Sequence, residues 1–356
     1  MGHAAGPPWS YLVLECPDTR THRQPRAMPE ALADQSLVSP DRVSLDRIMT
    51  ARDVIRGRLH YTPAVRSTFL SDRVGAPIHL KLELFQKTGS FKPRGVLNRL
   101  ANLTDAERQR GLITLSAGNH AQAVAWAARQ YGVKATVVMP AKAMKAKVDA
   151  TRGYGGDVLQ TDGDLLATAL ELQRERNLTL VHPFDCPFVI AGQGTLGLEV
   201  VEQVPEVETV LVAVGGGGLI SGVAAAVKSV KPNVRVIGVE PVGAPGMTES
   251  LRRSEPVRLD RLDTIADGLA APFVGRLNYL HARDLVDEMV LVTDDEIIAA
   301  IPVLMERCKV MPEPAGAATT AALLSGKVSL TRGSPIVAIV SGGNIDRTRL
   351  KQLLPD

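Results

Sequence analysis

Lys92 is the residue of the chain best suited to covalent catalysis. It stands in residues 89–95 (GSFKPRG), where Ser90 can cap a helix and Pro93 is tolerated in a helix's first turn. A cation at that end of a helix opposes the helix dipole, which favours the neutral amine that attacks carbonyl groups. An ordinary surface lysine is the alternative interpretation.

Four successive glycines form the strongest candidate for an anion site. They are Gly215, Gly216, Gly217 and Gly218, and Leu219 opens the helix expected after them. Backbone N–H groups at a helix N-terminus, unobstructed by Cβ atoms, bind phosphate well. A tight turn between a strand and a helix is the alternative, but such a turn rarely needs four glycines.

The glycine run does not match the common nucleotide-binding fingerprints. A GxGxxG motif starting at Gly215 would need its third glycine at Ile220, and one starting a residue later would need it at Ser221. No Gly-Lys-Ser/Thr of a Walker A loop follows. Glu240 nevertheless ends the next expected strand, where the acid of an NAD-binding enzyme stands, so a nicotinamide-dependent oxidoreductase stays open as an alternative.

Two further polar turns follow expected strands. Residues 116–120 (SAGNH) offer backbone N–H groups to a second anion, such as a substrate carboxylate, although His120 itself is more typical of a packing histidine. Residues 341–344 (SGGN) follow the last expected strand, and ligands of open α/β sheets bind beyond the carboxyl ends of the strands. An ordinary turn remains the alternative there.

The elements expected around these loops form two α/β series. Strands and helices alternate over residues 112–182, and a second series runs from a helix at 197–203 to a last strand at 336–340. The alternation predicts parallel βαβ units in two lobes with a cleft between them. Lys92 would directly precede a helix at 94–103.

The composition argues against several classes of protein. The 356 residues, 45% hydrophobic and 22% charged, suit a soluble globular protein of one or two domains. A net charge of +3 with scattered basic residues predicts no nucleic-acid partner, and no apolar run is long enough for a membrane span. Three cysteines without a CxxC pair, and no signal peptide, predict a cytoplasmic protein without disulfides or a metal site.

Seven motifs together resemble those of the fold-type II pyridoxal-phosphate enzymes, most closely the short form of the serine/threonine dehydratases. The resemblance extends from about residue 44 to the end of the chain. In chain order, the matching segments are residues 89–95 (GSFKPRG), 116–122 (SAGNHAQ), 189–197 (VIAGQGTLG), 215–220 (GGGGLI), 266–268 (ADG), 313–317 (EPAGA) and 341–346 (SGGNID).

The resemblance implies an α/β fold of two domains, similar to the tryptophan synthase β subunit, each a mostly parallel sheet flanked by helices. Residues 43–112 and 191–356 would form the large cofactor-binding domain, and residues 113–190 a small inserted domain that closes over the active site. Residues 1–42, rich in proline and mixed charge, are expected to be a disordered extension. A homodimer or homotetramer is expected.

The resemblance also implies a cofactor, pyridoxal 5′-phosphate, and roles for the candidate residues. Lys92 would hold the cofactor as a Schiff base and then act as the base on the substrate Cα, and Ser341 would face the pyridine nitrogen. The other expected cofactor contacts are Phe91, Asn119, Gly215, Gly216, Gly217, Gly218, Leu219 and Glu313. The expected substrate contacts are Ser116, Ala117, Gly118, Asn119, His120 and Gly268.

The implied reaction is β-elimination of L-threonine or L-serine to 2-oxobutanoate or pyruvate plus ammonia. A serine hydroxyl at the pyridine nitrogen gives a weaker electron sink than an aspartate, which suits prompt loss of a β-leaving group. Other β-hydroxy amino acids, such as 3-hydroxyaspartate or a hydroxyectoine-derived compound, stay open as substrates. A catalytically silent binding protein on this fold is a further alternative.

Two departures from the family pattern narrow the chemistry. Serine racemases carry a second serine in the Ser-Ser-Gly-Asn-His loop, where this chain has Ala117, so racemisation is disfavoured. Relatives that bind a divalent cation use a glutamate, a backbone carbonyl and a later acid. Glu240 and Ala244 match the first two positions, but Gly246 stands at the third, so no metal site is expected.

Overall fold

The computed structural model describes residues 42–116, 118–331 and 333–354. The extension expected at residues 1–42 therefore lies almost entirely outside the described residues. The substrate contact expected of Ala117 lies outside them as well. In the described part of the chain, no helix is long and apolar enough to cross a membrane.

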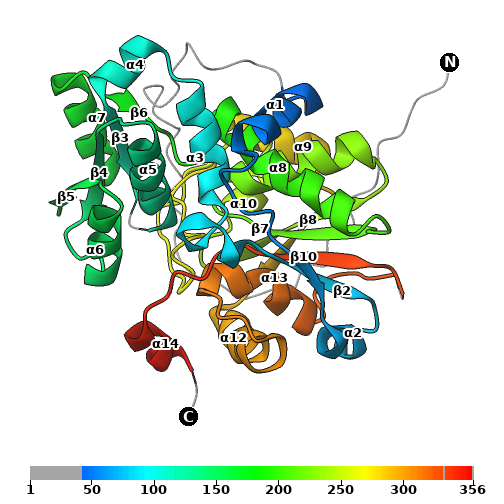
Figure 1. Cartoon of the computed structure of the whole chain (residues 1–356). Coiled ribbons are helices and arrows are strands. Elements are labelled where there is room, and N and C mark those ends of the chain that lie inside the picture. Colours follow the sequence, from blue (N-terminus) through cyan, green and yellow to red (C-terminus); the bar gives the residue numbers. More distant parts are fainter. Residues whose placement is uncertain (1–41, 117, 332, 355–356) are drawn as a thin grey trace.

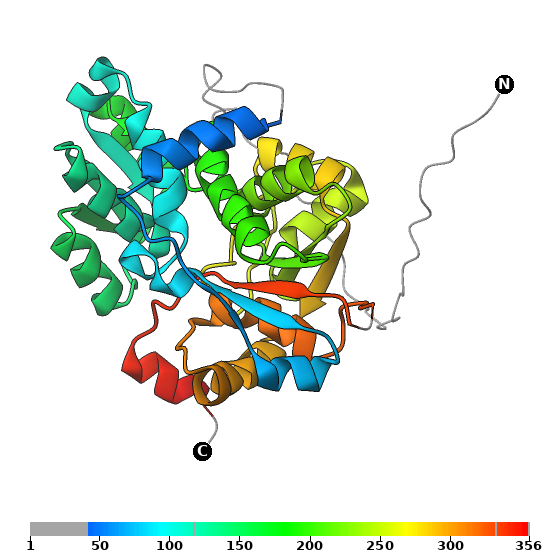
Figure 2. The same cartoon turned by 45° about the vertical axis from the view of Figure 1, so that its right-hand side comes forward.

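The strands of the described residues form two separate sheets (Figure 1). The larger sheet has six strands in the order β1-β2-β10-β7-β8-β9. Strands β1 and β2 pair antiparallel, and every other pair of neighbouring strands in this sheet is parallel. Its strands are β1 (Ala64–Arg66), β2 (Ile78–Leu82), β7 (Thr209–Ala213), β8 (Arg235–Pro241), β9 (Glu288–Val292) and β10 (Ile336–Val340). Figure 2 shows β2 and β10 side by side, although the two strands come from opposite ends of the chain.

The smaller sheet has four parallel strands in the order β5-β4-β3-β6. They are β3 (Leu112–Leu115), β4 (Ala135–Pro140), β5 (Asp157–Thr161) and β6 (Thr179–Leu180). All four lie between β2 and β7 in the sequence, so the chain leaves the larger sheet, builds the smaller one and returns. We call residues 112–180, which contain the smaller sheet, the four-stranded unit, and the rest of the described chain the six-stranded unit.

Helices cover both sheets. Those next to the four-stranded sheet or leading to it are α3 (Lys92–Ala101), α4 (Asp105–Arg110), α5 (Asn119–Gln130), α6 (Lys145–Gly153) and α7 (Leu165–Glu175). The others are α1 (Leu45–Ile55), α2 (Thr68–Val74), α8 (Pro187–Gln203), α9 (Gly218–Val230), α10 (Gly246–Arg253), α11 (Arg276–Leu285), α12 (Asp294–Cys308), α13 (Pro314–Leu324) and α14 (Arg347–Leu353). Two short 3₁₀ turns, η2 (Glu83–Phe85) and η3 (Lys87–Gly89), lead from β2 to α3.

Strand β7 shows how the larger sheet is buried on both faces. Val210 and Val212 pack into a core with α8 and α9, whereas Leu211 and Ala213 pack into another core with α12 and α13. Alternate residues of a strand point to opposite faces, so a continuous apolar run is what a doubly covered parallel strand requires. The α/β fold with helix-flanked parallel sheets, expected from the sequence, is confirmed.

Helix α8 is ten residues longer at its start than the helix expected at 197–203. Residues 189–197 contain three glycines, and glycine is a poor helix former. Each glycine lies at a close helix contact. A Cβ atom on Gly192 would lie 2.4 Å from the Arg94 carbonyl oxygen, and one on Gly197 would lie 2.9 Å from that of Val223. The glycines let α8 pack tightly against α3 and α9.

Candidate active site

The candidate loops meet at one cavity of about 450 Å³. Three of them follow the carboxyl ends of β3, β7 and β10, where ligands of parallel sheets bind. All the site residues expected from the sequence that the structure describes line this cavity, namely Phe91, Lys92, Ser116, Gly118, Asn119, His120, Gly215, Gly216, Gly217, Gly218, Leu219, Gly268, Glu313 and Ser341. Residues from both units contribute to its wall.

Lys92 is the first residue of α3, and Phe91 precedes it in the N-cap position. The expectation that Ser90 caps this helix is wrong. Ser90 is instead paired with Gly342 in an isolated antiparallel bridge, and the Phe91 N–H donates to the Ser341 carbonyl at 3.1 Å. Pairing with a distant segment has replaced the local cap, and it holds the lysine and the turn after β10 together.

The amine of Lys92 lies in the cavity in a setting that favours its neutral form. Its Nζ donates to the Pro183 carbonyl at 3.1 Å and lies 5.2 Å from the centre of the Phe91 ring. Burial lowers the pKa of Lys92 to about 8, an effect that the Glu313 carboxylate opposes. The amine is therefore a far better nucleophile near neutral pH than an ordinary lysine.

The glycine loop is built to bind an anion. Gly217 has φ +96°, which favours glycine, and a Cβ atom there would lie 2.7 Å from Met247 Cε. The Gly216 carbonyl is held by Asn278 Nδ2 at 2.9 Å and by the Gly275 N–H at 3.3 Å. Among the described residues, no protein acceptor takes the N–H groups of residues 215–217. These donors, at the N-terminus of α9, fit the phosphate of the implied cofactor.

Asn119, at the start of α5, is held by hydrogen bonds on both sides. Its Nδ2 donates to Glu313 Oε1 at 2.5 Å, and its Oδ1 accepts from Asn344 Nδ2 at 2.8 Å. Asn344 in turn donates to the Thr88 carbonyl at 2.7 Å. Burial raises the pKa of Glu313 to about 7, although the bond from Asn119 opposes this. Asn344 stands in the polar turn expected at residues 341–344, but no role was expected of its side chain.

Two buried histidines flank the lysine and carry no charge. His120 Nε2 lies 3.2 Å from the Val181 carbonyl, and His182 Nδ1 accepts from the Asp185 N–H at 2.8 Å. Burial, and then the charge of Lys92, lowers the pKa of His120 well below its usual value and that of His182 to about 3. His120 is thus packed and hydrogen-bonded in its neutral form. His182 was missed because no motif marks it.

The hydroxyl of Ser341 lies at the carboxyl end of β10. The residue is 3% exposed, and its Oγ donates to the Ala315 carbonyl at a long 3.4 Å. A hydroxyl so weakly bonded can turn to a better acceptor, and the pyridine nitrogen of the implied cofactor is one.

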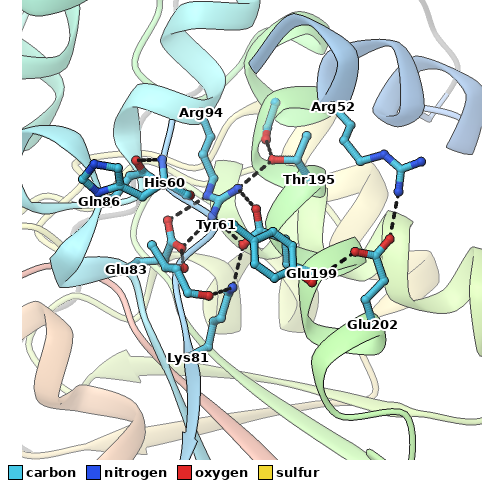
Figure 3. Close-up of polar contacts among 12 residues, drawn as sticks. Arg52, His60, Tyr61, Lys81, Glu83, Gln86, Arg94, Thr195, Glu199 and Glu202 are labelled. Atoms are coloured by element: carbon cyan, nitrogen blue, oxygen red, sulfur yellow. Dashed lines mark hydrogen bonds and ion pairs between the residues drawn. The ribbon is translucent and has the colours of Figure 1, made fainter. Parts of the chain in front are cut away.

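A buried ion-pair cluster surrounds Arg94, two residues after Lys92 in the sequence (Figure 3). The Arg94 guanidinium is paired with Glu83 at 2.8 Å and with Glu199 at 2.6 Å, and Lys81 Nζ lies 2.5 Å from Glu199. Burial alone would lower the pKa of Arg94, but the two carboxylates raise it above its usual value. The cluster balances two cations with two anions and fixes α3 to β2, η2 and α8.

Glu240, the residue behind the oxidoreductase alternative, lies elsewhere. It is buried at the end of β8, and its carboxylate accepts from the N–H groups of Met247 at 2.7 Å and Thr248 at 2.9 Å. It caps α10 and does not line the cavity. Within the described residues, no three His, Cys, Asp or Glu side chains are grouped to hold a metal ion.

Comparison with known proteins extends these observations. Residues 55–342 match the family described as "Pyridoxal-phosphate dependent enzyme". An L-threonine ammonia-lyase of Thermotoga maritima is 44% identical over 316 residues, which are 88% of this chain and 78% of that protein. A catabolic L-threonine dehydratase of Staphylococcus aureus is 44% identical over 318 residues, 88% of this chain and 92% of that protein.

Two solved structures also superpose on most of this chain. Maize serine racemase superposes with a TM-score of 0.84 at 40% identity and covers 88% of this chain and 97% of its own. The processed form of threonine deaminase isoform 2 from Solanum lycopersicum superposes with a TM-score of 0.80 at 38% identity and covers 88% of this chain and 94% of its own.

Proposed function

The chain belongs to the family of pyridoxal-phosphate dependent enzymes, and from that premise we propose that it is an ammonia-lyase acting on L-threonine, and also on L-serine. The products would be 2-oxobutanoate or pyruvate, with ammonia. The observation that carries the proposal is that the Lys92 amine, the glycine loop and the loop at residues 116–120 open into one cavity. The relatives named above as threonine ammonia-lyase, dehydratase and deaminase support this reaction.

The cavity residues fit the cofactor, and each has a proposed task. When bound, pyridoxal phosphate withdraws electrons from the Cα of an attached amino acid and makes its proton acidic. The N–H groups of residues 215–217 would bind the phosphate, and Asn119 would hold the ring oxygen with its remaining N–H. The Ser341 hydroxyl would donate to the pyridine nitrogen.

Lys92 would hold the cofactor covalently and would then accept the Cα proton of the substrate at Nζ. Its lowered pKa favours this second task, because the neutral amine is the base. The backbone N–H groups of Asn119 and His120 would bind the substrate carboxylate and orient the Cα–H bond toward the amine. Those of Ser116 and Gly118, expected to do the same, already donate to the Val138 carbonyl at 3.1 Å and to Ser116 Oγ at 3.1 Å. Burial lowers the pKa of both His120 and His182, which makes them weak bases, so Lys92 is the stronger proton acceptor for this step.

An apolar wall supports threonine as a substrate. Phe184 and Phe273 lie with ring centres 5.4 Å apart and pack with Leu166 and Ala271. All four line the cavity. Such a wall offers a favourable surface to the methyl group of threonine and keeps water from the reacting carbon. Racemisation is not favoured, since the chain has an alanine at position 117 where a serine would supply a second base.

The arrangement of the chain suggests how the site works as a whole. We propose that residues 113–190 form a small domain that closes over the substrate, because the four-stranded unit supplies one wall of the cavity. A homodimer or homotetramer in the cytoplasm is proposed on the family resemblance alone.

An assay for 2-oxo acids tests the proposed reaction. Purified protein loaded with pyridoxal phosphate is incubated with L-threonine, L-serine and a panel of other β-hydroxy amino acids. We expect 2-oxobutanoate from L-threonine and loss of the activity in Lys92→Ala. No 2-oxo acid from any member of the panel would refute the proposal.

A further inference from the structure

We propose that Lys147 binds the α-carboxylate of the substrate and so makes the site selective for free amino acids. The inference deepens the proposed function and rests on it. No sequence motif marks this lysine, which lies in the first turns of α6 in the four-stranded unit. It lines the cavity together with Ser116, Gly118 and Asn119.

The ammonium group of Lys147 lies next to the loop that would bind the carboxylate. Its Nζ is 3.9 Å from the point where a Cβ atom on Gly118 would stand, and Gly118 immediately precedes α5. The Lys147 side chain is only 15% exposed. A cation in this position adds its charge to the backbone N–H groups at the start of α5, and both attract a carboxylate.

The ion pair of Lys147 with Asp267 leaves the lysine able to bind a substrate carboxylate. Its Nζ donates to Asp267 Oδ2 at 3.0 Å, but Asp267 is 65% exposed, and such exposed pairs contribute little. An ammonium group has three donors, and no other protein acceptor within the described residues takes one from Lys147. The two remaining donors are available to a substrate carboxylate.

The other basic groups of the cavity are committed elsewhere. Lys92 has the covalent task proposed above. Arg258 lies over the Phe273 ring at 5.9 Å and faces Asp164 at 4.0 Å, which places it at the apolar wall. Lys147 is therefore the cation beside the carboxylate-binding loop. Since Asp267 belongs to the six-stranded unit, the lysine also joins the two units across the cavity.

Four variants of the cofactor-loaded enzyme test the assignment. Lys147→Met removes the charge, Lys147→Arg keeps it, and Asp267→Asn removes only the partner. Lys145→Met is the matched control, since Lys145 lies on the same helix, is 88% exposed and pairs, within the part of the chain that the structure describes, with Asp149 alone. We expect KM for L-threonine to rise about 10–100-fold in Lys147→Met with a much smaller change in kcat, because a charge-assisted hydrogen bond is lost. The arginine variant should largely restore KM, and the control should match the wild type.

Binding of paired ligands shows whether the lysine recognises the carboxylate itself. L-alanine has no β-leaving group, and L-alaninamide also lacks the carboxylate. Lys147→Met should weaken binding of L-alanine about 10-fold or more, measured by titration of the cofactor spectrum, but leave binding of L-alaninamide unchanged. Equal weakening of both ligands, or an Asp267→Asn variant as impaired as Lys147→Met, would overturn the assignment, since Lys147 would then act only by joining the two units.

This binding test also separates the inference from the proposed function. If the wild-type enzyme released no 2-oxo acid, the proposed reaction would fail while the difference between L-alanine and L-alaninamide could still be measured. If the wild type is active and Lys147→Met discriminates between the two ligands as the wild type does, the inference alone fails.

Discussion

Asn344 donates a hydrogen bond from Nδ2 to Oδ1 of Asn119 at 2.8 Å, although 225 residues separate the two. The bond fixes which way the Asn119 amide points. Its Nδ2 must then face Glu313, where it donates at 2.5 Å. The turn after β10 thereby sets the orientation of a side chain at the start of α5, in the other unit.

Asn344→Leu tests that relationship. Loss of the bond frees the Asn119 amide to rotate, and we expect cofactor affinity to fall about 10-fold, the effect of one neutral hydrogen bond. Fluorescence titration of the apo enzyme with pyridoxal phosphate measures the change. Gln160→Ala is the control, because the Gln160 amide also donates to backbone carbonyls but lies away from the cavity. An unchanged dissociation constant in Asn344→Leu would contradict the proposed orientation.

Gly217→Ala should disable the glycine loop. The residue has φ +96°, and the added Cβ atom would lie 2.7 Å from Met247 and 2.8 Å from Asn278. Gly75→Ala is a matched control, since Gly75 has φ +77° but no atom within 4 Å of the added Cβ. We expect the control to lose about 1–2 kcal/mol of unfolding free energy from backbone strain and to bind cofactor normally. Gly217→Ala should lose more stability and most of its cofactor affinity. If both variants lost the same unfolding free energy and kept the same cofactor affinity, the close contacts of Gly217 would not be needed to bind the cofactor.

Lys92 should capture the cofactor at a lower pH than an ordinary lysine does. Because burial lowers its pKa from 10.5 to about 8, the reactive neutral amine is already dominant above about pH 8. The rate of covalent capture by the apo enzyme should rise with pH and level off there. The ionised Glu313 carboxylate raises the pKa of Lys92, so Glu313→Gln should move the midpoint to lower pH. A midpoint near 10.5 would show that the amine is not shielded from water.

We expect the ion-pair cluster of Arg94 to contribute mainly to the unfolding free energy of the protein. Arg94→Met leaves Glu83 and Glu199 buried with too little positive charge, which costs about 3–5 kcal/mol of unfolding free energy. Urea unfolding of the apo enzyme measures this cost. Arg56→Met breaks an exposed pair with Asp53 and should stay within about 0.5 kcal/mol of the wild type. Similar costs in both variants would mean that the cluster contributes no more than a surface pair.

The sequence predicted the parts of this site that have a local signature. A lysine next to proline at a helix start, and four glycines between a strand and a helix, are readable because the chemistry depends on neighbouring residues. The helix after Lys92 was expected at 94–103 and lies at Lys92–Ala101, a shift of two residues. Such boundaries depend on contacts beyond the segment.

Features that depend on distant partners were not predictable. Serine is a residue type that often caps helices, yet the backbone of Ser90 pairs with Gly342 instead. The start of α8 at Pro187 was not expected, and it is the close contacts of its glycines with α3 and α9 that offset their poor helix propensity. Asn344 stands in an expected polar turn, but its role depends on its bond to Asn119 of the other unit. Lys147 belongs to no motif, and its candidate role depends on its place in the wall of the cavity.

The central claim is that the Lys92 amine carries the cofactor in this cavity. Reduction of the cofactor-loaded enzyme with borohydride, followed by mass spectrometry of its peptides, tests it directly because reduction makes the bond permanent. The account predicts one phosphopyridoxyl group per chain, on Lys92, and none in Lys92→Ala. A label on another lysine, or an undiminished label in Lys92→Ala, would contradict it.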